Sequence, residues 1–321
     1  MTVLAALLLG AVEAWSLPGA RPCTPSEIAA LTGEADAPYI LTCRAVLTPN
    51  QTIIRPVRII GAEASGAGLD CAGGSVGQAG VTVAASAPTL AVWSRRINAD
   101  TWSRPTDIRI RNCLIHGAVR IWGMGGDGSY DDLRASSRTP EHTARLQAAA
   151  PSHVMLERVT IRASGTIPLY VGPGVTRLSL VRSTLDGRSV STAIYLDAES
   201  ADNLIENNLI RTETPREKIA VDGSARNRIV GNRFELGGRP GVLLYRNCGE
   251  RGVIRHQTPS YNTITDNIFS DAGRLRPRLV VENARQGRRS YCSADRGYPW
   301  GSSIDDHDGA SNNIVSQNFR K

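Results

Sequence analysis

An eight-residue pattern that recurs along the chain constrains its fold more than any other feature. Its clearest copies are NLIENNLI (203–210), NRIVGNRF (227–234), NTITDNIF (262–269) and NNIVSQNF (312–319). Weaker copies, which keep only the apolar positions, begin at residues 108, 154 and 178. The closest copies start 24 or 25 residues apart. A repeat of this period is typical of a solenoid.

Each copy alternates apolar and polar residues, which predicts β-strands and not helices. A second short apolar segment precedes most copies, at 168–172, 193–197, 218–222, 241–245 and 278–282, with a less regular member at 118–122. The unit therefore consists of a strand, a turn, a strand, an asparagine-rich turn and a strand. A unit of this length with three short strands is one coil of a parallel β-helix. Leucine-rich and helical repeats are excluded because their spacings are absent.

Asparagine recurs at two positions of the pattern. One set is Asn208, Asn232 and Asn267, and the other is Asn203, Asn227, Asn262 and Asn312. Asparagine tolerates the left-handed backbone conformation, and its side-chain amide can hydrogen-bond from one coil to the next. The sequence thus predicts that every coil turns the same corner and stacks on the coil before it.

These repeats, with GLDCAGG at 68–74, resemble the right-handed parallel β-helix proteins of the pectin-lyase-like superfamily across roughly residues 40–320. The resemblance implies an all-β, single-domain solenoid with long loop insertions on one edge. Polysaccharide lyases, glycoside hydrolases, epimerases and phage spikes share this fold, so the resemblance leaves the reaction open. The Gly-His-Gly motif of the polygalacturonase-like hydrolases is absent.

The first 16 residues resemble a secretory signal peptide, because an apolar run from Val3 to Val12 is followed by small residues. The run is too short to span a bilayer. We therefore expect a β-helix domain over 17–321 in a periplasmic or secreted protein.

All six cysteines follow this segment, and no C-x-x-C spacing occurs, which disfavours a zinc cluster. An exported chain with six cysteines can form up to three disulfides. Sequence does not choose among the pairings. One guess is Cys248 with Cys292, because their loops are expected to leave adjacent coils.

The formal net charge of +7 suits a polyanionic partner. Nucleic acid is disfavoured in an exported protein that lacks interleaved basic and aromatic patches. We expect a monomer that binds an acidic polysaccharide. Of the 37 basic residues only Lys218 and Lys321 are lysines, so arginine supplies 37 − 2 = 35. This bias draws attention to Lys218, the one lysine within the repeats.

Strand alternation places six polar or aromatic side chains on one outer face of the solenoid. They are Tyr170, Tyr195, Asp197, Lys218, Asp222 and Tyr245. Long insertions follow Trp122, Tyr245 and Glu282, on the coils that flank this face. Long loops in a compact repeat are usually functional or disordered. We expect them to wall a cleft that suits a linear polymer.

Several residues are candidates for chemistry in this cleft. Lys218 or His256 could act as a base, and Tyr195 or Tyr245 as an acid. Other residues could bind substrate: Arg246, Arg255, Tyr170, Asp197, Asp222, and Arg145 and His142 in the insertion at 123–153. Each has a plainer alternative. Lys218 could be a solvated strand end, His256 an ordinary surface residue, and the two aspartates structural ion pairs.

Asp197 and Asp222 are expected one above the other on neighbouring coils. They could bind calcium, pair with Lys218 or an arginine, or form the carboxylate pair of a hydrolase. Three functions follow from these possibilities. The favoured one is a lyase that cleaves a uronate-containing polymer by β-elimination. The alternatives are a glycoside hydrolase that uses Asp197 and Asp222, and a non-catalytic β-helix that binds polysaccharide or a surface.

Overall fold

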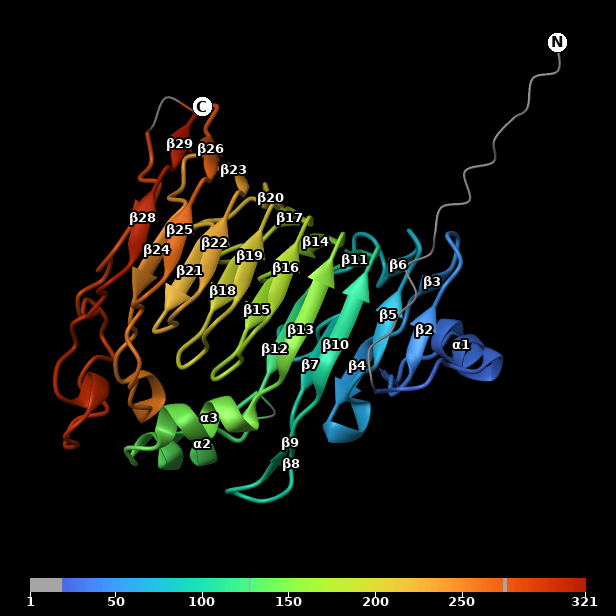
Figure 1. Ribbon diagram of the computed structural model, residues 1–321, viewed down its shortest axis with the longest axis horizontal. Coiled ribbons are helices and arrows are strands. Elements are labelled where there is room, and N and C mark those ends of the chain that lie inside the picture. The colour runs from blue at the N-terminus through green and yellow to red at the C-terminus, as the bar shows by residue number, and fades with distance from the viewer. Residues whose placement is uncertain (1–18, 127, 274–275) are drawn as a thin grey trace, which may run out of the picture.

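The chain folds into a right-handed parallel β-helix of nine coils (Figure 1). The computed structural model describes residues 19–126, 128–273 and 276–321. Each coil contributes one strand to each of three parallel nine-stranded sheets, which confirms the predicted architecture. The expected signal peptide at 1–16 lies outside the described residues. No helix among the described residues is long and apolar enough to cross a membrane.

The three sheets follow one another around every coil, and coils are numbered here by their strand in sheet 1. Sheet 1 comprises β1 (Tyr39–Ile40), β4 (Val57–Ile60), β7 (Leu90–Trp93), β12 (Val119–Trp122), β15 (Leu169–Val171), β18 (Ile194–Leu196), β21 (Ile219–Asp222), β24 (Val242–Tyr245) and β27 (Val280–Val281). Sheet 2 comprises β2 (Arg44–Val46), β5 (Gly68–Asp70), β10 (Thr106–Arg111), β13 (Ser152–Glu157), β16 (Ser179–Val181), β19 (Leu204–Glu206), β22 (Arg228–Val230), β25 (Thr263–Thr265) and β28 (Ile314–Ser316). Sheet 3 comprises β3 (Thr52–Ile53), β6 (Ser75–Val76), β11 (Leu114–His116), β14 (Thr160–Ser164), β17 (Thr184–Arg188), β20 (Leu209–Ile210), β23 (Arg233–Glu235), β26 (Ile268–Ser270) and β29 (Phe319–Arg320).

The core is a set of columns in which the same inward position of successive coils is apolar. In sheet 2, Ile205, Ile229 and Ile264 pair in register and are fully buried. In sheet 3, the rings of Phe234 and Phe269 stack with centroids 4.5 Å apart. Burying such side chains stabilises each by about 1.5–3 kcal/mol, so every coil depends on its neighbours for most of its stability.

Two asparagine columns fix the corners at either end of sheet 2. Each side-chain amide donates to the side-chain carbonyl of the asparagine on the next coil, at 2.8–3.0 Å. The columns are Asn203–Asn227–Asn262–Asn313 and Asn208–Asn232–Asn267–Asn318. Coil-to-coil bonding is thus confirmed, but the last member of the first column is Asn313, not Asn312.

The left-handed backbone at these corners belongs to the residue before each asparagine. Asp202, Arg226 and Tyr261 precede the first column with φ of 56–60°. Asn312 occupies the same place with φ 54°, which explains why the pattern shifts by one residue there. Left-handed φ costs a non-glycine residue roughly 1–3 kcal/mol, so the bonds of the following asparagine hold a strained corner in place.

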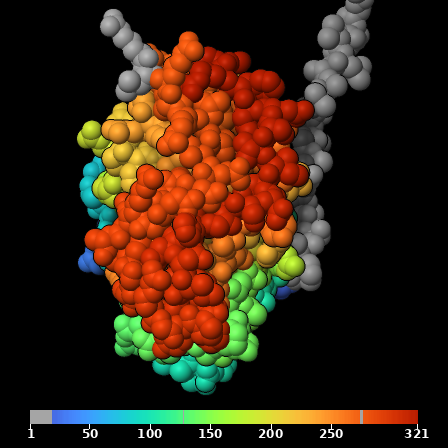
Figure 2. All heavy atoms as spheres, turned by 90° about the vertical axis from the view of Figure 1, so that its left-hand side faces the viewer, coloured from blue at the N-terminus to red at the C-terminus, as the bar shows by residue number. Residues whose placement is uncertain are grey.

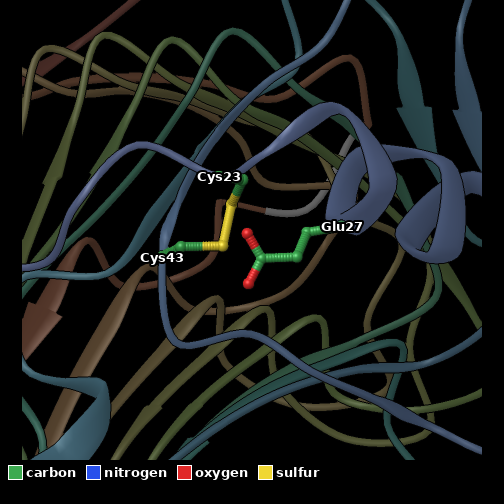
Figure 3. A group of neighbouring side chains, drawn as sticks. All are labelled: Cys23, Glu27 and Cys43. Carbon is green, nitrogen blue, oxygen red and sulfur yellow. A yellow bond between two sulfur atoms is a disulfide. The ribbon is translucent and has the colours of Figure 1, made fainter.

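The N-terminal end of the solenoid is covered by α1 (Pro25–Thr32), which buries Leu31 against the first coil. Thr24 and Glu27 form a capping box at the start of this helix. The Cys23–Cys43 disulfide ties the segment before α1 to the first coil, and Glu27 lies beside it (Figure 3). The helix is therefore fixed at its start both by its cap and by a covalent link.

The other two disulfides are Cys71–Cys113, between the second and third coils, and Cys248–Cys292. The latter confirms the suggested pairing. It joins the insertion after β24 to the insertion after β27. Three disulfides are typical of proteins that fold in an oxidising compartment such as the periplasm or outside the cell.

Four insertions leave the ends of sheet 1 strands, all at one edge of the solenoid (Figure 1). Three were predicted: that after β12 contains α2 (Tyr130–Ser137) and α3 (His142–Ala149), that after β24 contains the short helix η2 (Glu250–Gly252), and that after β27 contains η3 (Gly301–Ser303). The fourth, missed in the sequence, is the hairpin β8 (Arg95–Arg96) and β9 (Trp102–Ser103) after β7. Viewed from the C-terminal end, the last coils and their insertions cover the solenoid in orange and red (Figure 2).

The register of the last coil differs from the expected one by a residue. Val280 pairs with the inward Val242, and Val281 with the outward Leu243. Strand alternation along 278–282 predicts that Val280 and Glu282 point outward. Val280 instead packs against the core, whereas Glu282 is exposed as predicted. The strand is only two residues long, so its own alternation carries little information.

Replacing the mid-column Asn232 with alanine should destabilise the fold strongly. The fully buried Asn232 amide donates to Asn267 and to the Ile205 carbonyl, and its carbonyl accepts from Asn208. Leaving these groups unpaired should cost about 2–4 kcal/mol. The matched control is Asn318→Ala at the exposed end of the same column, which should cost less than half as much. Urea unfolding measures both, and equal costs would contradict a role for the continuous column.

Candidate functional site

A cavity of about 780 Å³ lies over the outer face of sheet 1, roofed by the insertions. Its floor consists of one aromatic residue from each of coils three to six: Trp93, Trp122, Tyr170 and Tyr195. Its walls come from the insertion after β12, including Met124 and Tyr130, and from the insertion after β24, including Arg251 and Arg255. We call this cavity the cleft.

The four floor rings form two stacks. Trp93 and Trp122 pair in register, and their centroids lie 5.3 Å apart with planes 17° from parallel. Tyr170 and Tyr195 also pair in register, with centroids 5.7 Å apart. All four side chains are partly exposed. Because coils are about 4.8 Å apart, a polymer lying along the solenoid axis would meet one ring per coil.

Each floor tyrosine donates a hydrogen bond to an aspartate on the next coil. The Tyr170 hydroxyl donates to Asp197, and the Tyr195 hydroxyl donates to Asp222 at 2.5 Å. The two tyrosines are 25 residues apart, and so are the two aspartates. The same tyrosine–aspartate hydrogen bond therefore occurs twice, on successive coils. Burial, with the adjacent carboxylate second, raises the pKa of each tyrosine well above its usual range. Both phenols are therefore neutral at ordinary pH.

Asp222 is fully buried behind Tyr195. Asn247 donates to it from its backbone N–H at 2.7 Å and from its side-chain amide at 2.6 Å. Burial raises the pKa of Asp222 to about 7, although Arg255 and these donors favour the ionised form. The carboxylate is accordingly poised between its two protonation states near neutral pH.

Arg255 is the charged group that closes the cleft over the two aspartates. Its Nη1 lies 3.4 Å from an oxygen of Asp197. Burial disfavours its charge, but Asp197 and Asp222 outweigh burial and raise the pKa of Arg255. Its Nε is buried and has no hydrogen-bond partner among the described residues. One side of a planar guanidinium thus lacks the acceptor that such a group prefers.

A second arginine, Arg120, lies in the floor beneath the tyrosines. Its guanidinium sits 5.6 Å from the centroid of the Tyr170 ring. It donates to the carbonyl of Ile167 and, at 2.8 Å, to the hydroxyl of Thr166. Burial lowers its pKa to about 10, which leaves it charged at neutral pH. Arg120 therefore adds positive potential to the cleft while it anchors the entry to the next coil.

Glu199 holds the roof of the cleft to the solenoid. This fully buried residue lies in the turn after β18, where φ is 62°. Its carboxylate accepts from the Thr143 hydroxyl in α3 and from the backbone N–H groups of His256 and Gln257. One side chain thereby joins two insertions to the coil that carries Tyr195 and Asp197.

The structure brings together one group of the predicted site residues. Tyr170, Tyr195, Asp197 and Arg255 line the cleft, and Asp222 lies directly behind Tyr195. These five residues come from three successive coils and one insertion. Strand alternation predicted the shared face of Tyr170, Tyr195, Asp197 and Asp222, which lie in or directly after sheet 1 strands.

Lys218 is not on the cleft floor, so the expectation that it lies beside Asp197 is wrong. Its side chain is buried at the opposite end of β21, where the chain enters sheet 1, and its Nζ donates to the Thr212 carbonyl at 2.6 Å. Burial lowers the pKa of Lys218 to about 8. The residue lines a different cavity, described below.

The two predicted histidines lie behind the cleft wall rather than in it. The His256 Nε2 donates to the Ser137 carbonyl at 2.7 Å, and its ring packs 4.9 Å from that of His142. His142 is fully buried, and burial, with His256 second, lowers its pKa to about 2. Both residues join the two insertions to each other, and neither lines the cleft.

Tyr245, Arg246 and Arg145 are also placed outside the cleft lining. Tyr245 is fully buried, and its hydroxyl donates to Glu217 at 3.1 Å. Arg246 donates to the carbonyls of Asp305 and His307 in the last insertion. Arg145 faces Asp100 in the hairpin insertion, at 3.8 Å. Arg246 and Arg145 thus serve contacts among the insertions, whereas Tyr245 bonds to the connection before β21.

Asp197 and Asp222 are not arranged as a calcium site. Their oxygens accept from tyrosine hydroxyls and from N–H groups of Ala198 and Asn247, with Arg255 adjacent. Calcium prefers six to eight oxygen ligands, whereas the partners here are donors and a cation. Two other groups of possible metal ligands, Cys23–Glu27–Cys43 and Cys248–Cys292–Asp306, contain cysteines already joined in disulfides.

Sequence reasoning missed Trp93, Trp122, Arg120, Glu199 and Asn247. A signal for the tryptophans existed, because AVW (91–93) and RIW (120–122) end two successive sheet 1 strands with the same residue. Glu199 and Asn247 lie in connections, where strand alternation makes no prediction. Comparison with known proteins adds no assignment: no family model matches this chain, and no curated protein matches it either.

Glu199→Gln should loosen the roof while leaving the solenoid folded. The uncharged amide is a weaker acceptor for the Thr143 hydroxyl and the two backbone N–H groups. Amide hydrogen exchange at 246–257 should accelerate about tenfold or more, with little change at β19 or β22. The matched control Glu206→Gln alters an outward residue of β19. Uniform acceleration along the chain would contradict this local role.

The stability of the protein should depend on pH through Asp222. The folded state keeps its proton up to about pH 7, whereas the unfolded chain releases it near its ordinary pKa of 3.8. Between these values the folded state binds more protons, so the free energy of unfolding falls as pH rises, by on the order of 2–4 kcal/mol. Urea unfolding across this range should show that Asp222→Asn removes this part of the slope. An unchanged slope in the variant would contradict the assignment.

Proposed function

We propose that this protein is an exported, carbohydrate-active β-helix protein that binds an acidic polysaccharide in the cleft. The observation that carries the proposal is the position of Arg255 at the wall of a cleft with four aromatic rings on its floor. Its guanidinium is buried, and its Nε has no partner in the part of the chain that the structure describes. A uronate unit has the two features that such a site recognises. Its ring can stack on an aromatic face, and its carboxylate can accept from the guanidinium.

The positions of the charged groups support an acidic ligand over a neutral one. Many arginines elsewhere are paired with carboxylates, as Arg111 is with Asp70 and Arg226 with Asp202. Among the described residues that line the cleft, Arg255, Arg120 and Arg251 meet two acidic side chains, Asp197 and Glu250. The positive potential of the chain is thus available where the aromatic floor lies.

For the reaction, the Tyr195–Asp222 pair favours β-elimination. Tyr195 faces the cleft, and its hydroxyl bonds a buried carboxylate whose pKa is about 7. Tyr195 would take the proton from the carbon next to the uronate carboxylate while passing its own proton to Asp222. The glycosidic C–O bond then breaks, and the proton returns through Tyr195 to the leaving oxygen. The electron pair of the C–H bond becomes the new C=C bond, so no other reactant is required.

This assignment replaces the bases expected from the sequence. Lys218 and His256 lie outside the cleft, and among the described residues its lining contains no lysine or histidine. Arg255, expected from the sequence to bind substrate, would neutralise the uronate carboxylate and so acidify the neighbouring C–H. Hydrolysis by Asp197 and Asp222 is less well supported, because Asp222 is fully buried behind Tyr195 and does not line the cleft.

The test is the ultraviolet absorbance of an unsaturated product over a panel of uronate polymers, with a neutral polymer as control. Tyr195→Phe should lower the rate by about 100-fold or more and leave binding intact. Arg255→Gln should weaken binding by about tenfold or more, unlike Arg228→Gln on the exposed face of sheet 2. The rate should rise as pH passes about 7, where Asp222 ionises and can accept the proton. A calcium chelator should change nothing.

Each result has a separate meaning. New reducing ends without new absorbance would move the reaction to hydrolysis. Binding to uronate polymers without any product would leave a non-catalytic polysaccharide-binding protein. Failure to bind any of the polymers, or equal binding to the neutral one, would overturn the proposal.

A further inference from the structure

A second cavity, of about 1000 Å³, lies at the opposite edge of sheet 1 from the cleft, at the corner between sheets 3 and 1. It opens where sheet 3 ends and the chain turns into sheet 1, whereas the cleft lies toward the ends of the sheet 1 strands. Its lining comes from the ends of β17, β20, β23 and β26 and from the connections that follow them. Within the described ranges, the two linings share no residue.

Both lysines of the chain line this cavity. The sequence contains 35 arginines but only Lys218 and Lys321, and the two are 103 residues apart. Three arginines lie in the same lining, so positive charge alone does not require lysine there. Lysine differs from arginine in carrying a compact charge with three N–H donors that one small anion can share.

Lys218 is placed as a binding group at the inner end of the cavity. Only 2 % of its surface is exposed, yet it lines the cavity. Within the described part of the chain its Nζ makes one hydrogen bond, to the Thr212 carbonyl, so two N–H donors remain unused. A buried ammonium group with unused donors is costly. The lowered pKa of Lys218, caused first by burial, reflects this cost.

The charges around the cavity leave an excess of cations. Lys218, Lys321, Arg188, Arg211 and Arg239 face three acids, Glu213, Glu235 and Asp271. Arg188 lies 3.6 Å from Glu213, and Arg211 pairs at 3.0 Å with Asp186, outside the lining. Asp271 already accepts backbone N–H groups of Gly238 and Gly273 through one oxygen. Over the described lining as a whole, cations thus outnumber acids by five to three, while the three acids oppose the lowering of the Lys218 pKa by burial and so favour its charged form.

We propose that this cavity is a second binding site, in which Lys218 binds the oxyanion of a small ligand that carries a carboxylate, sulfate or phosphate group. Two N–H donors of Lys218 fit two oxygens of such a group. Arg239 and Lys321 add charge at the rim, and the hydroxyls of Ser270 and Thr214 offer bonds to the remainder of the ligand. The depth of Lys218 selects a small group and excludes a broad macromolecular surface. The proposal does not depend on the function of the cleft.

The experiment uses the full chain labelled with ¹⁵N-lysine, which gives only two side-chain signals. Inorganic phosphate, sulfate and glucuronate are titrated separately at constant ionic strength, with chloride as the control anion. At least one of the three anions should shift the Lys218 signal until it saturates. The same anion should raise the apparent pKa of Lys218 by about one unit, which corresponds to a tenfold preference for the charged amine. Lys218→Met should abolish binding of that anion measured by calorimetry, whereas Arg228→Gln should not.

The anion that shifts the Lys218 signal to saturation is the oxyanion that the site binds. Arg239→Gln, which leaves Lys218 in place, should weaken binding about threefold to tenfold, so the proposal stays testable even where Lys218→Met fails to fold. The proposal is overturned by a Lys218 signal that none of the three anions moves saturably. It is equally overturned by a shift that chloride reproduces, or by binding that survives in folded Lys218→Met.

Discussion

The parallel stacking of coils at a constant register is the constraint on which the rest of the structure depends. Left-handed residues such as Asp202 and Arg226 turn each corner, and the asparagine columns hold consecutive corners together. Because the register does not drift, side chains 25 residues apart meet their counterparts on the next coil. The Tyr170–Asp197 and Tyr195–Asp222 bonds are consequences of this register, and no loop has to position them.

The cleft adds to this regular floor a roof made of irregular chain. The roof has a small apolar core of its own, which includes Leu133, Leu146 and Val253. Buried polar contacts then connect it to the solenoid, chiefly through Glu199. The floor is thus rigid through repetition, whereas the roof is held by a few specific bonds. Such a division lets insertions change the ligand while the fold stays constant.

The positions of side chains in the repeated strands could be predicted from the sequence. Alternation placed Tyr170, Tyr195 and Asp197 correctly on the outer face of sheet 1, because their strands have well-formed neighbours on both sides. It failed for Lys218, which lies just before β21 and whose Nζ bonds the Thr212 carbonyl in the preceding connection. It also failed for His256 and Arg246, because contacts within long insertions are not periodic. A sequence repeat therefore predicts where a side chain lies only in those segments whose backbone repeats from coil to coil.

The distribution of the two kinds of basic residue follows from this division. Arginine serves where a planar group must bridge fixed acceptors, as Arg120 bridges Ile167 and Thr166 at the entry to a coil. Arg255, in the cleft wall, has the same planar group, but its Nε has no partner among the described residues. Lys218 has two N–H donors without a described partner in the cavity at the opposite edge of sheet 1. Arg246 also has a buried Nε without a partner among the described residues, but it lies outside the cleft. Incomplete hydrogen bonding at a buried charge therefore indicates a ligand-binding group only where the side chain also lines a cavity.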